Sequence, residues 1–159
     1  MACKFIYVEF EMKNLECILH PTDFSKNSSK ALKYACIFAR QFDAELHILH
    51  VINNAAILSP GIEGVIPSDY YQKLTEHARN ELEKSPGDSL KFNGPVIRSV
   101  CEGIPFVEIV RYAKENNINM IIMGTHGRTG LMHMLIGSVA ENVVRRSPCP
   151  VLTVHPDEN

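Results

Sequence analysis

The chain has 159 residues, 45% of them hydrophobic, and a formal net charge of −2. This size fits one domain with enough apolar material for a core, and the nearly neutral charge excludes a binding mode that needs a broad basic face, as duplex DNA does. No apolar run approaches the roughly 18 residues of a membrane span. Glu9 and Glu11 interrupt the partly apolar N-terminus and no cleavage site follows, so we expect no signal peptide and a cytoplasmic location.

Short apolar runs alternate with helical patterns along the first half of the chain. Cys17–His20 predicts a strand that is broken by Pro21-Thr-Asp23. In 28–42 the apolar residues recur every three or four positions, which predicts a helix with one buried face. The apolar segment 46–52 predicts a strand covered on both faces, and the Pro- and Gly-containing segment 53–67 predicts a loop.

The alternation of helices and strands continues in residues 68–105. Ser68 is expected to cap a helix that ends before Pro86-Gly87. The segment 96–100 predicts a third strand, and Pro105 fits the first turn of the helix that follows it.

Two strands and one helix complete the pattern. Residues 120–123 predict a strand that Gly124 ends, and Ser138-Val-Ala-Glu141 reads as a capping box that opens a helix ending at Ser147-Pro148. Residues 151–154 predict the last strand. This order predicts an α/β fold: a single three-layer α/β/α sandwich around a five-stranded parallel sheet with right-handed crossovers.

Residues that follow the strands are the candidates for a binding site, because open parallel sheets bind ligands beyond the carboxyl ends of their strands. Pro21-Thr22-Asp23 follow the first strand and Val51-Ile52-Asn53 end the second. The fourth strand is followed by Gly124-Thr-His-Gly127-Arg-Thr-Gly130. Glycines in such a loop allow positive φ and bring backbone N–H groups close to an anion.

A helix N-terminus is predicted beside this glycine loop. Gly137-Ser138 would open the helix, whose free N–H groups and partial positive charge attract an anion, and Arg128 adds a cation. A phosphate chain is the natural occupant, and Asp23 could accept hydrogen bonds from a ribose hydroxyl or a base amine. Asp23 and Ser138 as simple helix caps, Arg128 as a solvated charge and the glycines as a tight turn stay open as alternatives.

The common phosphate-binding motifs are absent from the chain. Neither the Walker A pattern nor a G-x-G-x-x-G after the first strand occurs, and the pattern present is Gly124-x2-Gly127-x9-Gly137-Ser138. A metal site is not expected either. His47 and His50 should point to opposite faces of a strand, and His126 and His133 have no Cys or carboxylate at ligand spacing.

The five cysteines are an odd number without a CxxC pair. Free, mostly buried thiols in a reducing cytosol are the simplest interpretation. A redox role for Cys149 is the alternative, although only Arg145 and Arg146 are near it in sequence to lower its pKa.

Several of these segments resemble the ATP-binding branch of the universal stress protein family. They are Met123–Gly130, Leu135–Asn142, Ser147–Val154 and Gly103-x-Pro105. The resemblance covers about Leu15 to Val154. It implies a Rossmann-like fold of the adenine nucleotide alpha hydrolase type, with strand order 3-2-1-4-5, a domain over 15–155 and an N-terminal extension over 1–14. Asn119 stands where the family usually has Asp, which should change a structural contact more than the site.

The resemblance also implies which residues meet an adenine nucleotide. Thr22 and Asp23 would contact adenine and ribose, Pro21 would shape the turn and Val51 would line the base pocket. The remaining implied contacts come from the glycine loop and the helix N-terminus: Met123, Gly124, Thr125, His126, Gly127, Arg128, Thr129, Gly130, Gly137, Ser138, Val139 and Ala140.

The function implied by the resemblance is a non-catalytic regulator that binds ATP, or AMP or ADP, with Mg²⁺ accompanying the nucleotide. It would form a homodimer through Val151–Val154, an apolar strand that needs covering. We expect no catalytic residues, because no nucleophile–base pair or Mg²⁺-binding carboxylate cluster is evident apart from Asp23. The alternatives are a slow ATPase or adenylate-transferring enzyme, and a nucleotide-free scaffold, which the glycines argue against.

Overall fold

The computed structural model describes residues 15–53, 69–127 and 136–155. In chain order its helices and strands are β1 (Cys17–Thr22), α1 (Lys26–Phe42), β2 (Glu45–Asn53), α2 (Tyr70–Glu83), the short 3₁₀ helix η1 (Asp88–Leu90), β3 (Val96–Gly103), α3 (Pro105–Glu115), β4 (Met120–Gly124), α4 (Ser138–Arg146) and β5 (Val151–Val154). The predicted alternation of strands and helices is confirmed.

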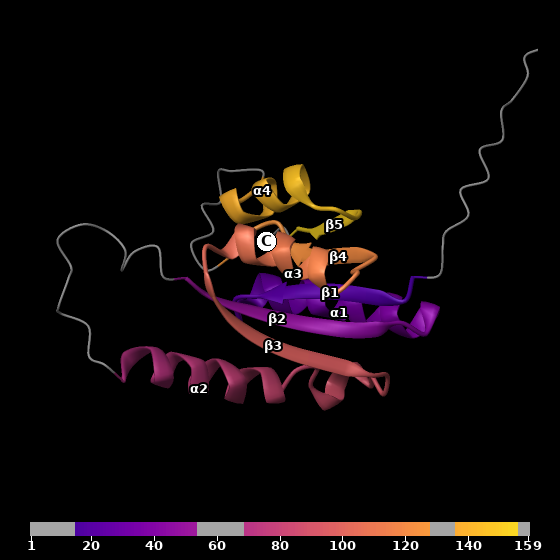
Figure 1. The fold of residues 1–159 in the computed structure, drawn as a ribbon. Coiled ribbons are helices and arrows are strands. Elements are labelled where there is room, and N and C mark those ends of the chain that lie inside the picture. Colours follow the sequence, from indigo (N-terminus) through magenta and orange to yellow (C-terminus); the bar gives the residue numbers. More distant parts are fainter. Residues whose placement is uncertain (1–14, 54–68, 128–135, 156–159) are drawn as a thin grey trace, which may run out of the picture.

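The strands form one parallel sheet in the order β3-β2-β1-β4-β5 (Figure 1). This confirms the expected order 3-2-1-4-5 and the three-layer α/β/α arrangement. The chain reverses direction across the sheet between β1 and β4, so the carboxyl ends of these two central strands meet at the point where open sheets bind ligands.

The sheet is covered on both faces, which explains why its central strands are apolar throughout. Adjacent residues of one strand belong to different cores: Ile18 and Ile48 pack with α1, whereas Leu19 and Leu49 pack with α3 and α4. Leu82 from the end of α2 joins the α1 side. The sheet therefore has a hydrophobic core on each of its two faces.

Some boundaries differ from the predictions. β1 continues through Pro21 and Thr22, which were expected to break it. The register between β1 and β4 ends at Leu19, so Pro21 has no partner residue on the β4 side of β1. A proline there removes no hydrogen bond between these two strands, although it has no N–H to donate. β3 runs on to Gly103, beyond its predicted end.

The helix starts differ as well. α2 begins at Tyr70 with Asp69 at its N-cap and no side-chain capping bond, whereas the predicted cap, Ser68, lies outside the described residues. Pro105 does occupy the first turn of α3, as predicted. Most of the predicted 53–67 loop also lies outside the described residues.

The predicted opposite orientation of the two β2 histidines is confirmed. The ring of His47 lies edge-on to Tyr112 of α3, with centroids 5.8 Å apart, whereas His50 stacks on Phe24 at 4.4 Å. Phe24 packs against the α1-side core. The two rings therefore serve different faces and different ends of β2.

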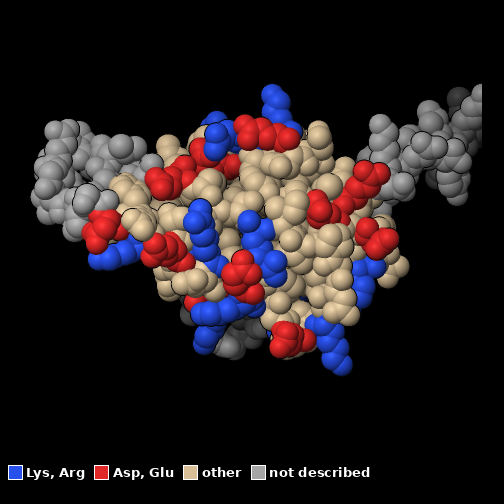
Figure 2. Space-filling model, turned by 60° about the horizontal axis from the view of Figure 1, so that its bottom comes forward, with Lys and Arg blue, Asp and Glu red and all other residues tan. Residues whose placement is uncertain are grey.

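The surface carries charges of both signs. Figure 2 shows Lys and Arg interspersed with Asp and Glu over the face that bears α2, so this face offers no broad basic area for nucleic acid. Within the described residues, no helix combines the length and the apolar character that crossing a membrane requires.

Candidate functional site

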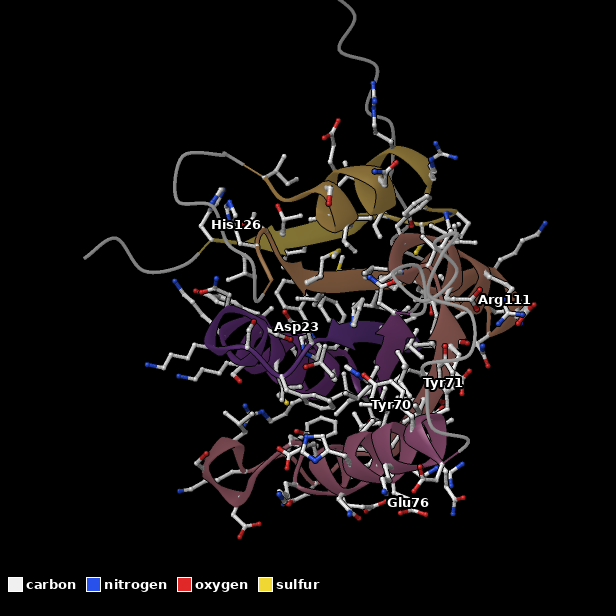
Figure 3. All side chains as sticks on the ribbon, turned by 90° about the vertical axis from the view of Figure 1, so that its left-hand side faces the viewer. Asp23, Tyr70, Tyr71, Glu76, Arg111 and His126 are labelled. Atoms are coloured by element: carbon white, nitrogen blue, oxygen red, sulfur yellow. The ribbon has the colours of Figure 1, made fainter. Side chains whose placement is uncertain are left out.

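A cavity of about 490 Å³ opens at the carboxyl ends of the strands. Figure 3 looks onto this edge, where Asp23 from the end of β1 and His126 from the segment after β4 lie on neighbouring elements and Tyr70 and Tyr71 mark the start of α2. The predicted site residues that line it are Pro21, Thr22, Asp23, Val51, Met123, Gly124, Thr125, His126, Gly127, Gly137, Ser138, Val139 and Ala140. Arg128, Thr129 and Gly130 lie outside the described residues.

The turn between β1 and α1 is held by its own side chains. Asp23 Oδ1 accepts a hydrogen bond from Ser25 N–H at 3.0 Å, and Thr22 Oγ1 accepts one from Phe24 N–H at 3.1 Å. The N-cap of α1 is Ser25, whose side chain accepts from Ser28 N–H at 3.2 Å. The alternative that Asp23 caps this helix is therefore wrong, and its carboxylate lies at the cavity wall.

Phe24 adopts a backbone conformation that bulky residues avoid, with φ at 63°. Such conformations cost of the order of 1–3 kcal/mol and occur mostly where function requires them. The ring is held by its stacking on His50, and His50 Nδ1 donates to the carbonyl of Thr22 at 2.8 Å. Sequence reasoning missed both residues, because the contact joins elements far apart in the chain.

His20 supports the same turn from below. Its ring is fully buried, Nδ1 donates to the carbonyl of Ile122 at 2.9 Å, and Nε2 lies 3.3 Å from Ser28 Oγ. The Ser28 hydroxyl donates to Thr22 Oγ1 at 2.9 Å. Burial lowers the pKa of His20 to about 4, outweighing the backbone hydrogen bond and the Asp23 charge, which raise it. The neutral imidazole of His20 thus stabilises the carboxyl end of β1.

The glycines around the cavity are needed for close approach and not for positive φ. The positive φ that glycine allows in this loop is not used at Gly124 or Gly127, since the one described glycine in that region of φ is Gly103. A Cβ at Gly137 would lie 3.1 Å from the Thr125 carbonyl oxygen, and one at Gly127 would lie 2.7 Å from Asp23 Oδ2. Larger residues would disturb the cavity wall.

Thr125 joins the end of β4 to the start of α4. Its carbonyl oxygen accepts a hydrogen bond from Gly137 N–H at 2.7 Å, and its own N–H donates to the carbonyl of Val154 at 3.0 Å. Its side chain is buried, so Thr125 contributes mainly structure to the cavity. The amide of Gly137 is consequently used within the protein and is not open to a ligand.

The N-terminus of α4 differs from the predicted capping box. Gly137 is the N-cap and makes no side-chain bond, while Ser138 is the first helical residue and is exposed. Glu141 N–H closes the first turn onto the Gly137 carbonyl at 2.9 Å. The N–H groups of Ser138, Val139 and Ala140 precede that bond and have no acceptor among the described residues. They line the cavity, at the positive end of the helix dipole.

The described wall of the cavity carries no Lys or Arg. Its charged and titratable side chains are Asp23 and the imidazoles of His50, His77 and His126. An anion would therefore meet the helix end as the main positive group among the described residues.

The structure adds lining residues that the sequence did not single out. Leu74, His77 and Ala78 come from α2, and Pro105 and Ile109 come from α3. The apolar periodicity of α2 indicated a buried face but could not indicate that this face borders a ligand cavity.

The described cysteines, Cys17, Cys36, Cys101 and Cys149, are all free, as expected, but the expectation that most are buried is wrong: Cys36 is buried and the other three are half-buried. Burial raises the pKa of Cys36 and Cys101 to about 11. Burial also raises the pKa of Cys149, by more than its hydrogen bonds to Ser147 and Ile121 lower it. A thiol in this state is a weak nucleophile, which disfavours the redox role considered for Cys149.

The comparison with known proteins agrees with the fold and covers nearly the whole chain. A profile of the Universal stress protein family matches residues 15–155. Universal stress protein MJ0577 of Methanocaldococcus jannaschii is 37% identical over 150 residues, covering 86% of this chain and 93% of that protein. The solved structure of MJ0577 superposes with a TM-score of 0.80 at 36% identity, over 92% of this chain and 99% of that one. UspA from Lactobacillus plantarum gives a TM-score of 0.78 at 25% identity, over 89% and 98%.

Proposed function

Because the chain belongs to the universal stress protein family, we propose that it is a regulatory protein that binds an adenine nucleotide, ATP above all, in the cavity at the carboxyl edge of the sheet. The observation that carries this proposal is the open N-terminus of α4. Three successive amide N–H groups, of Ser138, Val139 and Ala140, lie at the cavity wall without an acceptor among the described residues. Such an arrangement suits a phosphate chain.

The rest of the cavity suits a nucleoside. Val51, Leu49 and Met123 supply apolar surface of the kind that packs against a base. Asp23 lies at the wall with a carboxylate that accepts hydrogen bonds, as the hydroxyls of a ribose or the amine of adenine require. Gly127 leaves room beside Asp23 that a side chain would fill.

Mg²⁺ would enter this site with the nucleotide. Asp23 is the one carboxylate among the described lining residues, so the protein offers few ligands of its own. Magnesium in such sites keeps several waters and is held chiefly by the phosphates. The proposal therefore assigns the ion to the triphosphate and gives it no separate protein cage.

The regulatory role follows from differential binding. If ATP stabilises one conformation or assembly more than ADP does, the protein responds to the ratio of the two. β5 is an edge strand of the sheet, and three of its four residues are only half-buried. A homodimer pairing through Val151–Val154 in the cytosol would cover that edge.

Slow hydrolysis of ATP is the second candidate function. Asp23 is the observation that favours it, since a carboxylate at the phosphate-binding edge could orient a water molecule. Turnover of labelled ATP that is lost in Asp23→Ala would establish it. Binding of ATP without turnover would support the non-catalytic role.

Calorimetric titration with ATP, with and without Mg²⁺, tests the proposed function. We expect saturable binding at one site per chain, and Asp23→Ala should weaken it at least about tenfold, because a hydrogen bond to a charged group contributes about 1.5–3 kcal/mol. Asp23→Asn keeps an oxygen for Ser25 N–H, so loss of affinity in that variant reflects the ligand and not the turn. Asp88→Ala, at an exposed carboxylate in η1, is the matched control. Absence of any nucleotide binding by the unmodified chain would overturn the proposal.

A further inference from the structure

Three different metal-ligating side chains meet at the opposite, amino-terminal edge of the sheet. Cys17 and Glu45 are the first residues of β1 and β2 and are direct partners in the register of these strands. His47 follows two positions later in β2 and so lies on the same face as Glu45. One ligand atom from each side chain can be chosen so that all lie within 4.8 Å of one another.

The distances are close to those of a metal site. In tetrahedral zinc sites neighbouring ligand atoms are about 3.3–3.6 Å apart, given metal–ligand bonds of about 2.0–2.3 Å. His47 Nε2 and Glu45 Oε1 are 3.0 Å apart, and the remaining separations, which are at most 4.8 Å, need closing by up to about 1.5 Å, which side-chain rotation can supply. Thiolate, imidazole and carboxylate together are a zinc donor set, whereas Mg²⁺ and Ca²⁺ prefer oxygen alone.

The His47 ring is already oriented by an outer layer of hydrogen bonds. Nδ1 lies 3.0 Å from the hydroxyl of Tyr112, and that hydroxyl lies 3.1 Å from Ser99 Oγ. Metal-binding histidines typically have such a partner on the second ring nitrogen. The arrangement aims Nε2 at Glu45 and away from the core.

The same hydrogen-bond chain accommodates the tautomer that a metal needs. Without metal, Nε2–H donates to the Glu45 carboxylate and Nδ1 accepts from Tyr112. With metal on Nε2, the proton resides on Nδ1, which donates to Tyr112, and the Tyr112 hydroxyl turns to donate to Ser99 Oγ. Since hydroxyls act as donor or acceptor, no buried polar group loses its partner in either state.

The backbone beneath the ligands is fixed. Asn119 Oδ1 accepts hydrogen bonds from the N–H groups of Glu16 at 3.0 Å and Cys17 at 2.8 Å, which places Asn119 in a structural contact as expected. Glu45 N–H donates to the Glu16 carbonyl at 2.8 Å. The strands that bear the ligands are thereby tied together, which limits the reorganisation that binding requires.

The cluster is open to solvent on one side and distant from the cavity. The side chain of Glu45 is 36% exposed and that of His47 is 4% exposed, so an ion could enter past Glu45 while His47 closes the inner side. Cys17 and Thr22 are the two ends of β1, about 16 Å apart along the strand. A metal ion at one edge would not contact a ligand at the other.

We propose that Cys17, Glu45 and His47 bind a divalent transition metal ion of the Zn²⁺ type at the amino-terminal edge of the sheet, with water in the fourth position. The thiolate and the carboxylate would balance the two charges of the ion, and the thiol proton would leave on binding. Sequence spacing predicts no metal site here, because the cluster depends on the register between two strands. The proposal is independent of nucleotide binding.

Titration of the full, nucleotide-free chain with Co²⁺ and competition by Zn²⁺ test the site. We expect a thiolate-to-cobalt charge-transfer absorption that Zn²⁺ abolishes. Cys17→Ser should remove that absorption and weaken Zn²⁺ binding at least about tenfold, whereas the matched variant Cys149→Ser should keep both. ATP affinity should be the same in both variants, which separates this test from that of the proposed function.

Glu45→Gln provides a second, conservative test should Cys17→Ser fail to fold. Its amide oxygen can still accept from His47 Nε2–H, but it is a poor metal ligand, so Zn²⁺ affinity should again fall at least about tenfold. An unmodified chain without a thiolate–cobalt band would overturn the proposal. So would an unchanged band in Cys17→Ser, or unchanged zinc affinity in Glu45→Gln.

Discussion

The two edges of the sheet use polar groups in opposite ways. At the carboxyl edge, the residues Ser138, Val139 and Ala140 line a cavity, and their backbone N–H groups have no acceptor among the described residues. At the amino edge, side chains bond to one another, as His47 does to Glu45 and Tyr112. Substitutions that enlarge a side chain should therefore be most harmful at the carboxyl edge, where they fill space in the cavity. Substitutions that remove a polar atom should be most harmful at the amino edge, where they leave a hydrogen-bond partner unpaired.

The two buried histidines, His20 on β1 and His47 on β2, also differ in whether their hydrogen-bond partners carry charge. His20 bonds to a backbone carbonyl and approaches a serine hydroxyl, neither of which carries charge. His47 bonds to a carboxylate. Protonation of His20 would bury a positive charge that neither the carbonyl nor the serine hydroxyl neutralises, although the Asp23 carboxylate attracts it.

Acid should destabilise the protein through His20, and this is the largest effect we expect. Its pKa is about 4 in the folded state and about 6.5 in an unfolded chain, so the unfolded chain binds the additional proton between these values. The free energy of unfolding should consequently fall as pH decreases through this window, by up to about 3 kcal/mol. Denaturant unfolding at a series of pH values measures the slope.

Two variants isolate the contribution of His20. His20→Gln should be less stable at neutral pH but should show a flatter dependence on pH in this window. His77→Gln, at an exposed imidazole on α2, should keep the slope of the unmodified protein. Identical slopes in all three proteins would mean that folding does not lower the pKa of His20, which would contradict this prediction.

An added side chain at Gly137 should disrupt the carboxyl edge. Its Cβ would lie 3.1 Å from the Thr125 carbonyl oxygen, so the start of α4 and the end of β4 would have to separate by a few tenths of an ångström, and the remaining atoms of a larger side chain would need further space. We expect Gly137→Val to weaken ATP binding at least about 100-fold, together with a loss of about 1–3 kcal/mol in stability. Calorimetry and thermal unfolding measure the two effects.

Gly87→Val is the matched control for the added side chain. Gly87 has a similar extended conformation, and the nearest atom to its Cβ would be the Lys84 carbonyl oxygen at 3.6 Å, an ordinary contact. This variant should bind ATP with unchanged affinity. Native-like binding by Gly137→Val would show that phosphates do not lie at the start of α4.

The fold was predictable because the apolar segments are short, regular and well separated. The residues after the strands were predictable for the same reason, since parallel strands bring their ends together, and those that the structure describes line one cavity. The strand order came from the family resemblance and not from periodicity.

What the sequence did not reveal depends on contacts between distant segments. The hydrogen bond from Gly137 to Thr125 shifts the helix start, so Ser138 is not the cap that its capping-box pattern predicts. The positive φ of Phe24 is stabilised by His50 on another strand. Local patterns contain no information about such partners.

Removal of the Tyr112 hydroxyl at the amino edge should have the smallest effect on stability among these changes. The Tyr112 hydroxyl bridges His47 Nδ1 and Ser99 Oγ, so Tyr112→Phe leaves both without that partner and should cost about 1 kcal/mol of stability. Tyr34→Phe, at a ring that is 41% exposed on α1, should cost nothing measurable. ATP affinity should be unchanged in both, because Tyr112 lies outside the cavity lining. A loss of ATP affinity in Tyr112→Phe would show that the two edges are coupled through the sheet and are not independent of each other.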